Sequence, residues 1–222
     1  MNSDDIKRSV SEILHSLPSH VKLVAATKTR SAEEVQAAID AGIKIVGYNY
    51  LQEAEKIHEV IGEQVRWHMI GHLQKNKAKK AAKLFDMIET VDSFKLAQIL
   101  DKECAKHNKT MPVLIEINIA REKQKSGVLP EETLELVQKL SGLNHLHVKG
   151  LMTMGPLWAS PDELRSYFKQ TRSISDEIKK ENIPNIDMQY LSMGMSDSYK
   201  IAIDEGANIV RIGTKLFGKR NY

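Results

Sequence analysis

The stretch from residue 21 to residue 49, VKLVAATKTRSAEEVQAAIDAGIKIVGYN, decides the fold, because it holds a strand, a helix and a second strand in immediate succession. Residues 21–28 form a short apolar run rich in Val and Ala, which is typical of a buried strand. Residues 31–42 then carry apolar side chains at helical spacing behind a Ser-x-x-Glu capping sequence. Residues 43–49 return to a strand pattern. The stretch therefore predicts two parallel strands connected by a helix.

The same alternation continues along the chain. Strands are expected at 21–28, 43–49, 65–71, 85–91, 111–119, 146–154, 188–194 and 208–214. Helices are expected near 31–42, 50–62, 75–84, 94–108, 129–142, 160–182 and 196–206, with an amphipathic helix before them within 1–17. Eight strands with short turns favour a closed (β/α)8 barrel of the TIM type over an open doubly wound sheet. The sequence also lacks a Gly-rich dinucleotide fingerprint, so we expect a single α/β domain over residues 1–222.

The composition is ordinary for a soluble globular protein. Of 222 residues, 41% are hydrophobic and 27% are charged, and 32 basic side chains nearly balance 29 acidic ones. That balance argues against a nucleic-acid-binding protein, and no apolar run approaches the roughly 20 residues of a membrane span. The single cysteine, Cys104, excludes an internal disulfide and lies on an apolar helix stripe, so we expect a buried thiol in a reducing cytoplasm.

Lys28 follows the first apolar run and therefore stands at the carboxyl end of the first expected strand. Barrels of this type place their working residues at these strand ends. A partly desolvated lysine at the mouth of the barrel has a lowered pKa and exposes the free amine that attacks an aldehyde. Taken alone, this position fits a solvated lysine better than a reactive one. Residues at the other strand ends are needed to distinguish the two interpretations.

The last two strand ends are rich in small residues, in LSMGMS at 191–196 and NIVRIGT at 208–214. Barrels commonly bind a phosphate in the loops after strands seven and eight. The candidates for such a site are small or bear a hydroxyl group: Ser192, Gly194, Ser196, Gly213 and Thr214. The same residues suit tight turns and helix caps, and their spacing leaves both interpretations open.

Arg211 shares a face of the eighth strand with Ile209 and Gly213, because side chains alternate along a strand. If Gly213 faces a phosphate, Arg211 points at the same ligand from deeper in the barrel. A buried arginine needs hydrogen-bond acceptors, and a pyridine nitrogen is one that fits. A guanidinium does not give up its proton to a pyridine nitrogen. A ligand ring bound in this way would stay unprotonated and would be a poor electron sink. The alternative is a pairing of Arg211 with an internal carboxylate such as Glu116.

Other strand ends carry further polar candidates. Asn49 ends the second strand, His68 lies in WHMIGHLQKNK at the third, and Asn118 ends the fifth. Alternation places Glu116 and Asn118 on the inner face of the fifth strand, either as ligand contacts or as core polar residues with internal partners. All four residues are therefore expected inside the barrel or at its mouth.

Seven segments in collinear order resemble the pyridoxal phosphate homeostasis proteins, also called the YggS or PROSC family, which are similar to the N-terminal barrel of alanine racemase. The segments are ATKTR at 26–30, GYNYLQE at 47–53, WHMIGHLQKNK at 67–77, KSG at 125–127, GLMTM at 150–154, LSMGMS at 191–196 and RIGTKLFG at 211–218. The resemblance implies pyridoxal 5′-phosphate (PLP) as cofactor, held as a Schiff base on Lys28. It also implies that Arg211 faces the pyridine nitrogen, and that the phosphate is held by Ser192, Gly213 and Thr214.

One position departs from the family pattern. Asn49 matches the family position beside the ring, but Tyr48 stands where the family commonly has a glutamate. Alternation turns Tyr48 to the opposite side of the strand from Asn49. We therefore still assign Asn49 to the site, although it lacks the neighbouring negative charge that the family glutamate provides.

The resemblance further implies a monomeric carrier that buffers PLP and delivers it to PLP-dependent apo-enzymes. The alternative function is a PLP-dependent amino-acid racemase, which needs acid–base groups on both faces of the substrate carbon. In the similar alanine racemase one base comes from a separate C-terminal domain, for which we expect no room after the barrel. Lys28 can serve one face, with only His68 and Tyr48 as stand-ins on the other. We therefore predict cytoplasmic PLP homeostasis without catalytic turnover.

Overall fold

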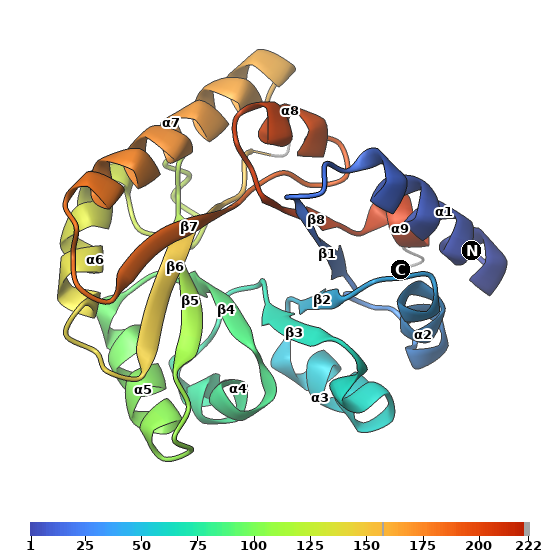
Figure 1. Ribbon diagram of the computed structural model, residues 1–222, viewed down its shortest axis with the longest axis horizontal. Coiled ribbons are helices and arrows are strands. Elements are labelled where there is room, and N and C mark those ends of the chain that lie inside the picture. Colours follow the sequence, from blue (N-terminus) through green and yellow to red (C-terminus); the bar gives the residue numbers. More distant parts are fainter. Residues whose placement is uncertain (157, 220–222) are drawn as a thin grey trace.

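The computed structural model describes residues 1–156 and 158–219, and the strands of this part form one closed parallel barrel (Figure 1). Each strand pairs with the next along the chain, and β8 pairs with β1 to close the sheet. The strands are β1 (Lys22–Ala26), β2 (Ile45–Tyr48), β3 (Arg66–Met69), β4 (Met87–Val91), β5 (Met111–Ile117), β6 (Leu146–Thr153), β7 (Ile186–Ser192) and β8 (Ile209–Ile212). The predicted barrel is confirmed, and only β7 begins before its predicted range.

Helices surround the barrel on its outer face (Figure 1). They are α1 (Ser3–Ser16), α2 (Ala32–Asp40), α3 (Leu51–Ile61), α4 (Ala78–Leu84), α5 (Phe94–Ala105), α6 (Thr133–Leu140), α7 (Pro161–Lys180), α8 (Tyr199–Asp204) and α9 (Thr214–Phe217). Three short 3-10 turns lie at Gly62–Gln64, Lys75–Lys77 and Pro130–Glu132. The extra helix α1 packs against α2 and α9 beside β1 (Figure 1), and α9 is an element that the sequence did not predict.

Two apolar layers stabilise the barrel. The larger one lies between the strands and the helices and includes the fully buried Trp67, Phe85 and Phe168. The smaller one fills the inside of the barrel with side chains from five strands and from Ile70, directly after β3: Val24, Ile70, Met87, Leu114, Met152 and Ile209. Because side chains alternate along a strand, the next inward position on several of these strands carries a polar residue. The barrel therefore has an apolar floor beneath a polar layer.

Gly150 fixes the irregular pairing around β6. Its φ is +147°, and a Cβ atom at this position would lie 1.9 Å from the carbonyl oxygen of Tyr190 on β7. The β6–β7 register shifts between Val148 and Gly150. This shift lets Val148 face the helices while Met152 points into the barrel, so the closed sheet depends on a glycine here.

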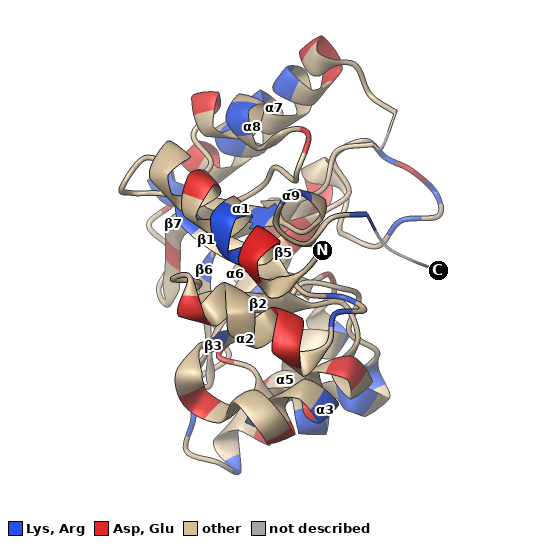
Figure 2. Ribbon diagram, turned by 90° about the vertical axis from the view of Figure 1, so that its right-hand side faces the viewer, with Lys and Arg blue, Asp and Glu red and all other residues tan. Residues whose placement is uncertain are grey.

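The surface and the cysteine agree with the composition. Figure 2 shows Lys and Arg interspersed with Asp and Glu over the helices, without a large region of one sign in this view. The lysine-rich helix α4 buries Ala78, Ala81 and Ala82 and exposes its lysines, as a solvated helix face does. Cys104 is fully buried, as predicted. None of the described helices is long and apolar enough to span a membrane.

Candidate functional site

Lys28 lies just past the carboxyl end of β1 and is half-buried at the mouth of the barrel. Its Nζ atom is 3.5 Å from the hydroxyl of Tyr50 and 4.8 Å from the centre of that ring. The next residue, Thr29, has a φ of +66°, an uncommon and strained conformation for a β-branched residue. Its backbone N–H donates to the carboxylate of Glu53. The loop that carries Lys28 is thus held in a strained turn against α3.

A buried polar network crosses the inside of the barrel at the level of Arg211. The Nη1 atom of Arg211 donates to Ser192 Oγ (2.6 Å), and its Nη2 atom donates to the carbonyl of Thr153 (2.8 Å). Ser192 in turn donates to Glu89 (2.5 Å), and the other oxygen of Glu89 accepts from His68 Nδ1 (2.6 Å). Strands β3, β4, β6, β7 and β8 therefore meet in one hydrogen-bonded chain.

The network sits above the apolar floor and below Lys28. Arg211 is the register partner of Val24 on β1, and Lys28 stands four residues further along that strand. Arg211 follows the floor residue Ile209 by two positions. The sequence-based prediction that Arg211 points into the barrel beneath the mouth is therefore confirmed by the geometry, while its contact with a pyridine nitrogen stays a prediction.

The charges of this network support one another. Burial alone would raise the pKa of Glu89, but the hydrogen bond and charge of His68, the Arg211 guanidinium and the Ser192 hydroxyl together hold it below its ordinary value. Burial lowers the pKa of Arg211, against the opposing fields of Glu89 and Glu116. The alternative in which Arg211 pairs directly with Glu116 is not what the structure shows, because Ser192 and Thr153 accept its hydrogen bonds.

Two polar residues lie at the end of β5, and they differ in their hydrogen bonding. The side-chain amide of Asn118 donates to the carbonyl of Glu122, and its oxygen accepts from the Glu122 N–H. Asn118 thus closes the loop after β5 and is a core polar residue with internal partners. Glu116 is 5% exposed, and its Oε2 atom has no hydrogen-bond partner among the described residues.

The loops after β7 and β8 lie against each other. The backbone N–H of Lys215 donates to Ser196 Oγ (3.4 Å), which joins the two loops beside Gly213 and Thr214. A Cβ atom on Gly213 would be 3.1 Å from the carbonyl of Ala26, so a side chain there would press on β1. At Gly194 the space for a side chain is filled by Ala202 and Tyr199 of α8, so this glycine serves helix packing.

Ser192 lies apart from these loops. Its side chain is fully buried and its hydroxyl is bonded to Glu89 and Arg211. The phosphate role assigned to Ser192 stays a prediction, and its observed partners place it in the buried network with Arg211 and Glu89. Among the hydroxyl-bearing candidates, Ser196 and Thr214 are the ones at the loop ends.

Asn49 is half-buried at the end of β2, and the backbone of Gly71 packs closely against its own backbone. Tyr48 points to the opposite side of the strand, as predicted, and stacks on Trp67 with ring centres 5.5 Å apart. Burial raises the pKa of Tyr48 to about 12. Asn49 and Tyr48 therefore face different environments, and only Asn49 faces the mouth side.

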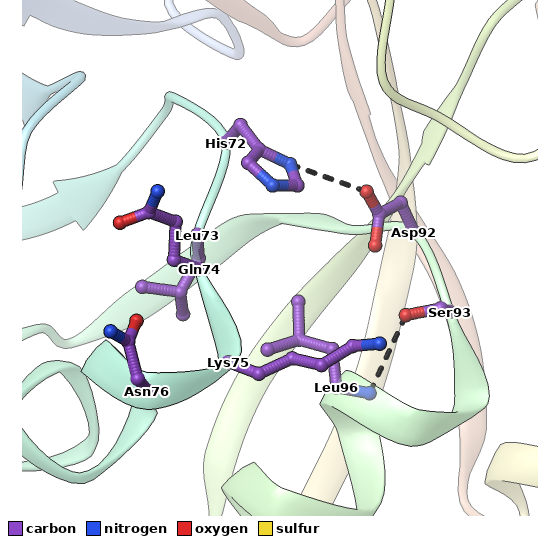
Figure 3. A pocket seen from close by; sticks show the side chains of 8 residues that line it. All are labelled: His72, Leu73, Gln74, Lys75, Asn76, Asp92, Ser93 and Leu96. Carbon is purple, nitrogen blue, oxygen red and sulfur yellow. Dashed lines mark hydrogen bonds and ion pairs between the residues drawn. The ribbon is translucent and has the colours of Figure 1, made fainter.

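A surface pocket adjoins the mouth between the β3 and β4 strand ends (Figure 3). It has a volume of about 620 Å³ and is lined by residues 72–76, Asp92, Ser93 and Leu96. His72 and Asp92 face each other across it at 3.4 Å, and Ser93 caps α5 through the Leu96 N–H. The sequence did not point to this pocket. It also missed Glu89, although alternation from Met87 places Glu89 inside the barrel.

The fold and this arrangement define a class of protein: a parallel (β/α)8 barrel with a strand-end lysine at its mouth and a buried arginine beneath it. A sequence profile of the family described as alanine racemase, N-terminal domain, matches residues 1–221. The chain is 40% identical over 202 residues to the pyridoxal phosphate homeostasis protein of Aquifex aeolicus, covering 90% of this chain and 88% of that protein. It is 40% identical over 210 residues to the pyridoxal phosphate homeostasis protein of Pasteurella multocida, covering 92% and 88% respectively.

The chain therefore belongs to the pyridoxal phosphate homeostasis proteins of the alanine racemase N-terminal domain family. Among solved structures it is similar to PipY of Synechococcus elongatus with PLP bound, at 32% identity and a TM-score of 0.89, covering 96% of this chain and 100% of that one. It also superposes on an alanine racemase of Clostridium difficile with a TM-score of 0.81, covering 99% of this chain and 58% of that one. At 16% identity this second likeness concerns the fold alone. The family resemblance read from the seven motifs is confirmed.

Proposed function

We propose that this protein binds PLP at the mouth of the barrel, holds it as a Schiff base on Lys28, and releases it to PLP-dependent apo-enzymes. The observation that carries the proposal is Arg211, which is fixed beneath the mouth by hydrogen bonds to Ser192 and Thr153. The relatives named for PLP homeostasis and the PLP-bound structure of PipY support the same ligand.

The residues present fit the cofactor. When bound, PLP supplies an aldehyde that reacts with an amine and a pyridine ring that withdraws electrons. Lys28 offers the amine at the rim, and the loops of Ser196 and Gly213 offer small residues for the phosphate. Arg211 holds its proton, so it donates to the ring nitrogen without protonating it and keeps the ring a poor electron sink. This donor set suits storage of the cofactor better than carbanion chemistry.

Neither of the two positions considered for a second base offers one that is open to a substrate. His68 is 5% exposed and its Nδ1–H donates to Glu89, which holds the imidazole inside the network. Tyr48 is fully buried on the outer side of β2 against Trp67, with its pKa raised to about 12. A two-base mechanism requires acid–base groups on both faces of the substrate carbon, so the geometry favours a carrier.

The Schiff base is tested by reducing the PLP-loaded protein with borohydride and mapping the modified peptide. We expect the label on Lys28 and its loss in Lys28→Ala, whereas Lys22→Ala, at the opposite end of the same strand, keeps it. A label on another lysine, or no uptake of PLP at all, refutes the proposed binding mode.

Delivery is tested separately by mixing the PLP-loaded protein with an apo-enzyme and following recovery of enzyme activity. We expect recovery faster than the spontaneous release of PLP measured with a PLP-trapping reagent. The loaded protein is also incubated with amino acids in heavy water. Repeated exchange of the α-proton by each protein molecule would instead identify an enzyme.

A further inference from the structure

Glu116 is a buried polar side chain of the barrel interior that neither the proposed function nor the hydrogen bonds of the Arg211 network use. It follows the floor residue Leu114 by two positions on β5, so it points inward. In a closed barrel with strand order β1 to β8, β5 is four strands from β1 in both directions. Glu116 therefore lies across the barrel from the strand that carries Lys28.

The surroundings of Glu116 give it cations nearby but no hydrogen bond for one of its oxygens. Arg211 donates to Ser192 and Thr153, and Lys125 pairs with Glu122 at 2.6 Å. The Oε2 atom of Glu116 is buried and has no partner among the described residues. A buried polar atom without a partner costs about 1–3 kcal/mol, so a ligand that provides one would gain from this position.

The charged groups near Glu116 come from β4 and its end, from β8 and from the loop after β5. Burial is the largest influence on its carboxyl group, followed by the negative charge of Asp92 at the end of β4 and by the opposing positive charges of Arg211 and Lys125. Glu89 on β4 carries a further negative charge inside the barrel. The net effect of burial, Asp92, Arg211 and Lys125 is to raise the pKa of Glu116 to about 7, so below neutral pH it is mainly a carboxylic acid that can donate a hydrogen bond.

We propose that Glu116 is a further cofactor-contacting residue, whose free carboxyl oxygen donates a hydrogen bond to the ring 3-oxygen of bound PLP. The inference rests on the proposed function, which assigns the aldehyde to Lys28, the ring nitrogen to Arg211 and the phosphate to the loops after β7 and β8. The 3-oxygen is then the remaining ring acceptor. On the PLP ring the 3-oxygen and the phosphate arm stand on opposite sides of the aldehyde carbon. With the phosphate at the loops after β7 and β8, the 3-oxygen points away from those strands, toward the part of the barrel wall that includes β5.

The test compares PLP dissociation constants and absorption spectra of wild type, Glu116→Gln and Glu116→Leu between pH 6 and pH 8.5. Glu116→Gln keeps a donor that does not titrate, and Glu116→Leu removes the donor. At pH 6 we expect roughly tenfold weaker binding for Glu116→Leu, the factor associated with one buried hydrogen bond. As pH rises to 8.5, wild type should lose roughly tenfold in affinity relative to Glu116→Gln, because the ionised carboxylate of wild type cannot donate a hydrogen bond.

The control is Glu135→Gln, which removes one negative charge from the exposed face of α6. It should follow wild type at every pH. Equal pH dependence in wild type and Glu116→Gln, or unchanged affinity in Glu116→Leu, overturns the inference. Failure of the proposed function looks different, since wild type itself would then take up no PLP or would carry the reduced label away from Lys28. Glu116→Gln keeps the size of the side chain, so the pH comparison survives even if Glu116→Leu does not fold.

Discussion

Replacing Glu116 by glutamine should make the ligand-free protein more stable at alkaline pH. The pKa of Glu116 is raised from 4.5 to about 7 by burial and by Asp92. A carboxyl group with a raised folded-state pKa contributes stability that is fully present below the unfolded pKa and is lost as pH rises through the folded pKa. Wild type should therefore lose this contribution between about pH 4.5 and pH 7, and Glu116→Gln should not.

The magnitude follows from the two pKa values. Between pH 5 and pH 8.5 the linkage relation gives a loss of about 2.5 kcal/mol for wild type, as an order-of-magnitude figure. Glutamine also changes the packing and the hydrogen bonding of the site, but those effects do not depend on pH over this range. The difference in unfolding free energy between the variant and wild type should thus grow by about 2.5 kcal/mol from pH 5 to pH 8.5.

The assay is urea unfolding of the ligand-free proteins at these two pH values, with the unfolding free energies obtained by linear extrapolation. Titrating groups that do not interact with Glu116 contribute equally to wild type and variant, so the comparison isolates Glu116 together with the charges coupled to it. A difference that changes by less than about 0.5 kcal/mol, against the linkage value above, would refute the reasoning. It would mean that the carboxyl group has an ordinary pKa and that a hydrogen-bond partner satisfies its second oxygen.

Three further outcomes are expected. Glu89→Leu should lower the unfolding free energy by about 3–5 kcal/mol in urea, because it leaves a buried arginine without its charge partner, whereas Glu135→Gln should leave the midpoint unchanged. Gly150→Ala should yield little folded protein by circular dichroism and gel filtration, since its Cβ would meet the Tyr190 carbonyl at 1.9 Å. Cys104 should resist a thiol reagent in the native protein and react once urea unfolds it, because burial raises its pKa to about 11.

The sequence predicted the barrel because its signals are local. Helical spacing in α2, capping boxes at Ser31 and Ser160, and short apolar runs each depend on neighbouring residues. The register shift before Gly150 and the short helix α9 were not predicted, because both depend on contacts with distant strands or helices. The early start of β7 at Ile186 has the same cause, since pairing with Val148 on β6 extends the strand.

The sequence predicted where the site residues lie but not which hydrogen bonds join them. Alternation placed Arg211 and Glu116 inside the barrel, and strand ends placed Lys28 at the mouth. The partners of Arg211 were not foreseen, because Ser192 and Thr153 come from strands that only the closed sheet brings together. Glu89 also lies in the apolar run MIETV, where a single acid has no local partner that would draw attention to it.

The arrangement separates the part of the site that recognises a ligand from the part that holds it covalently. Arg211 donates hydrogen bonds to residues on two other strands, which fix its orientation and leave further N–H groups of the guanidinium for a ligand. Lys28, in contrast, lies against the exposed ring of Tyr50 and precedes a strained Thr29. A carrier must bind firmly and still release its cargo. A rigid floor supplies affinity through preorganisation, and an accessible lysine on a strained loop leaves the covalent bond open to an incoming amine or to water. The proposed carrier function therefore requires that release be governed by the β1 loop rather than by the buried network.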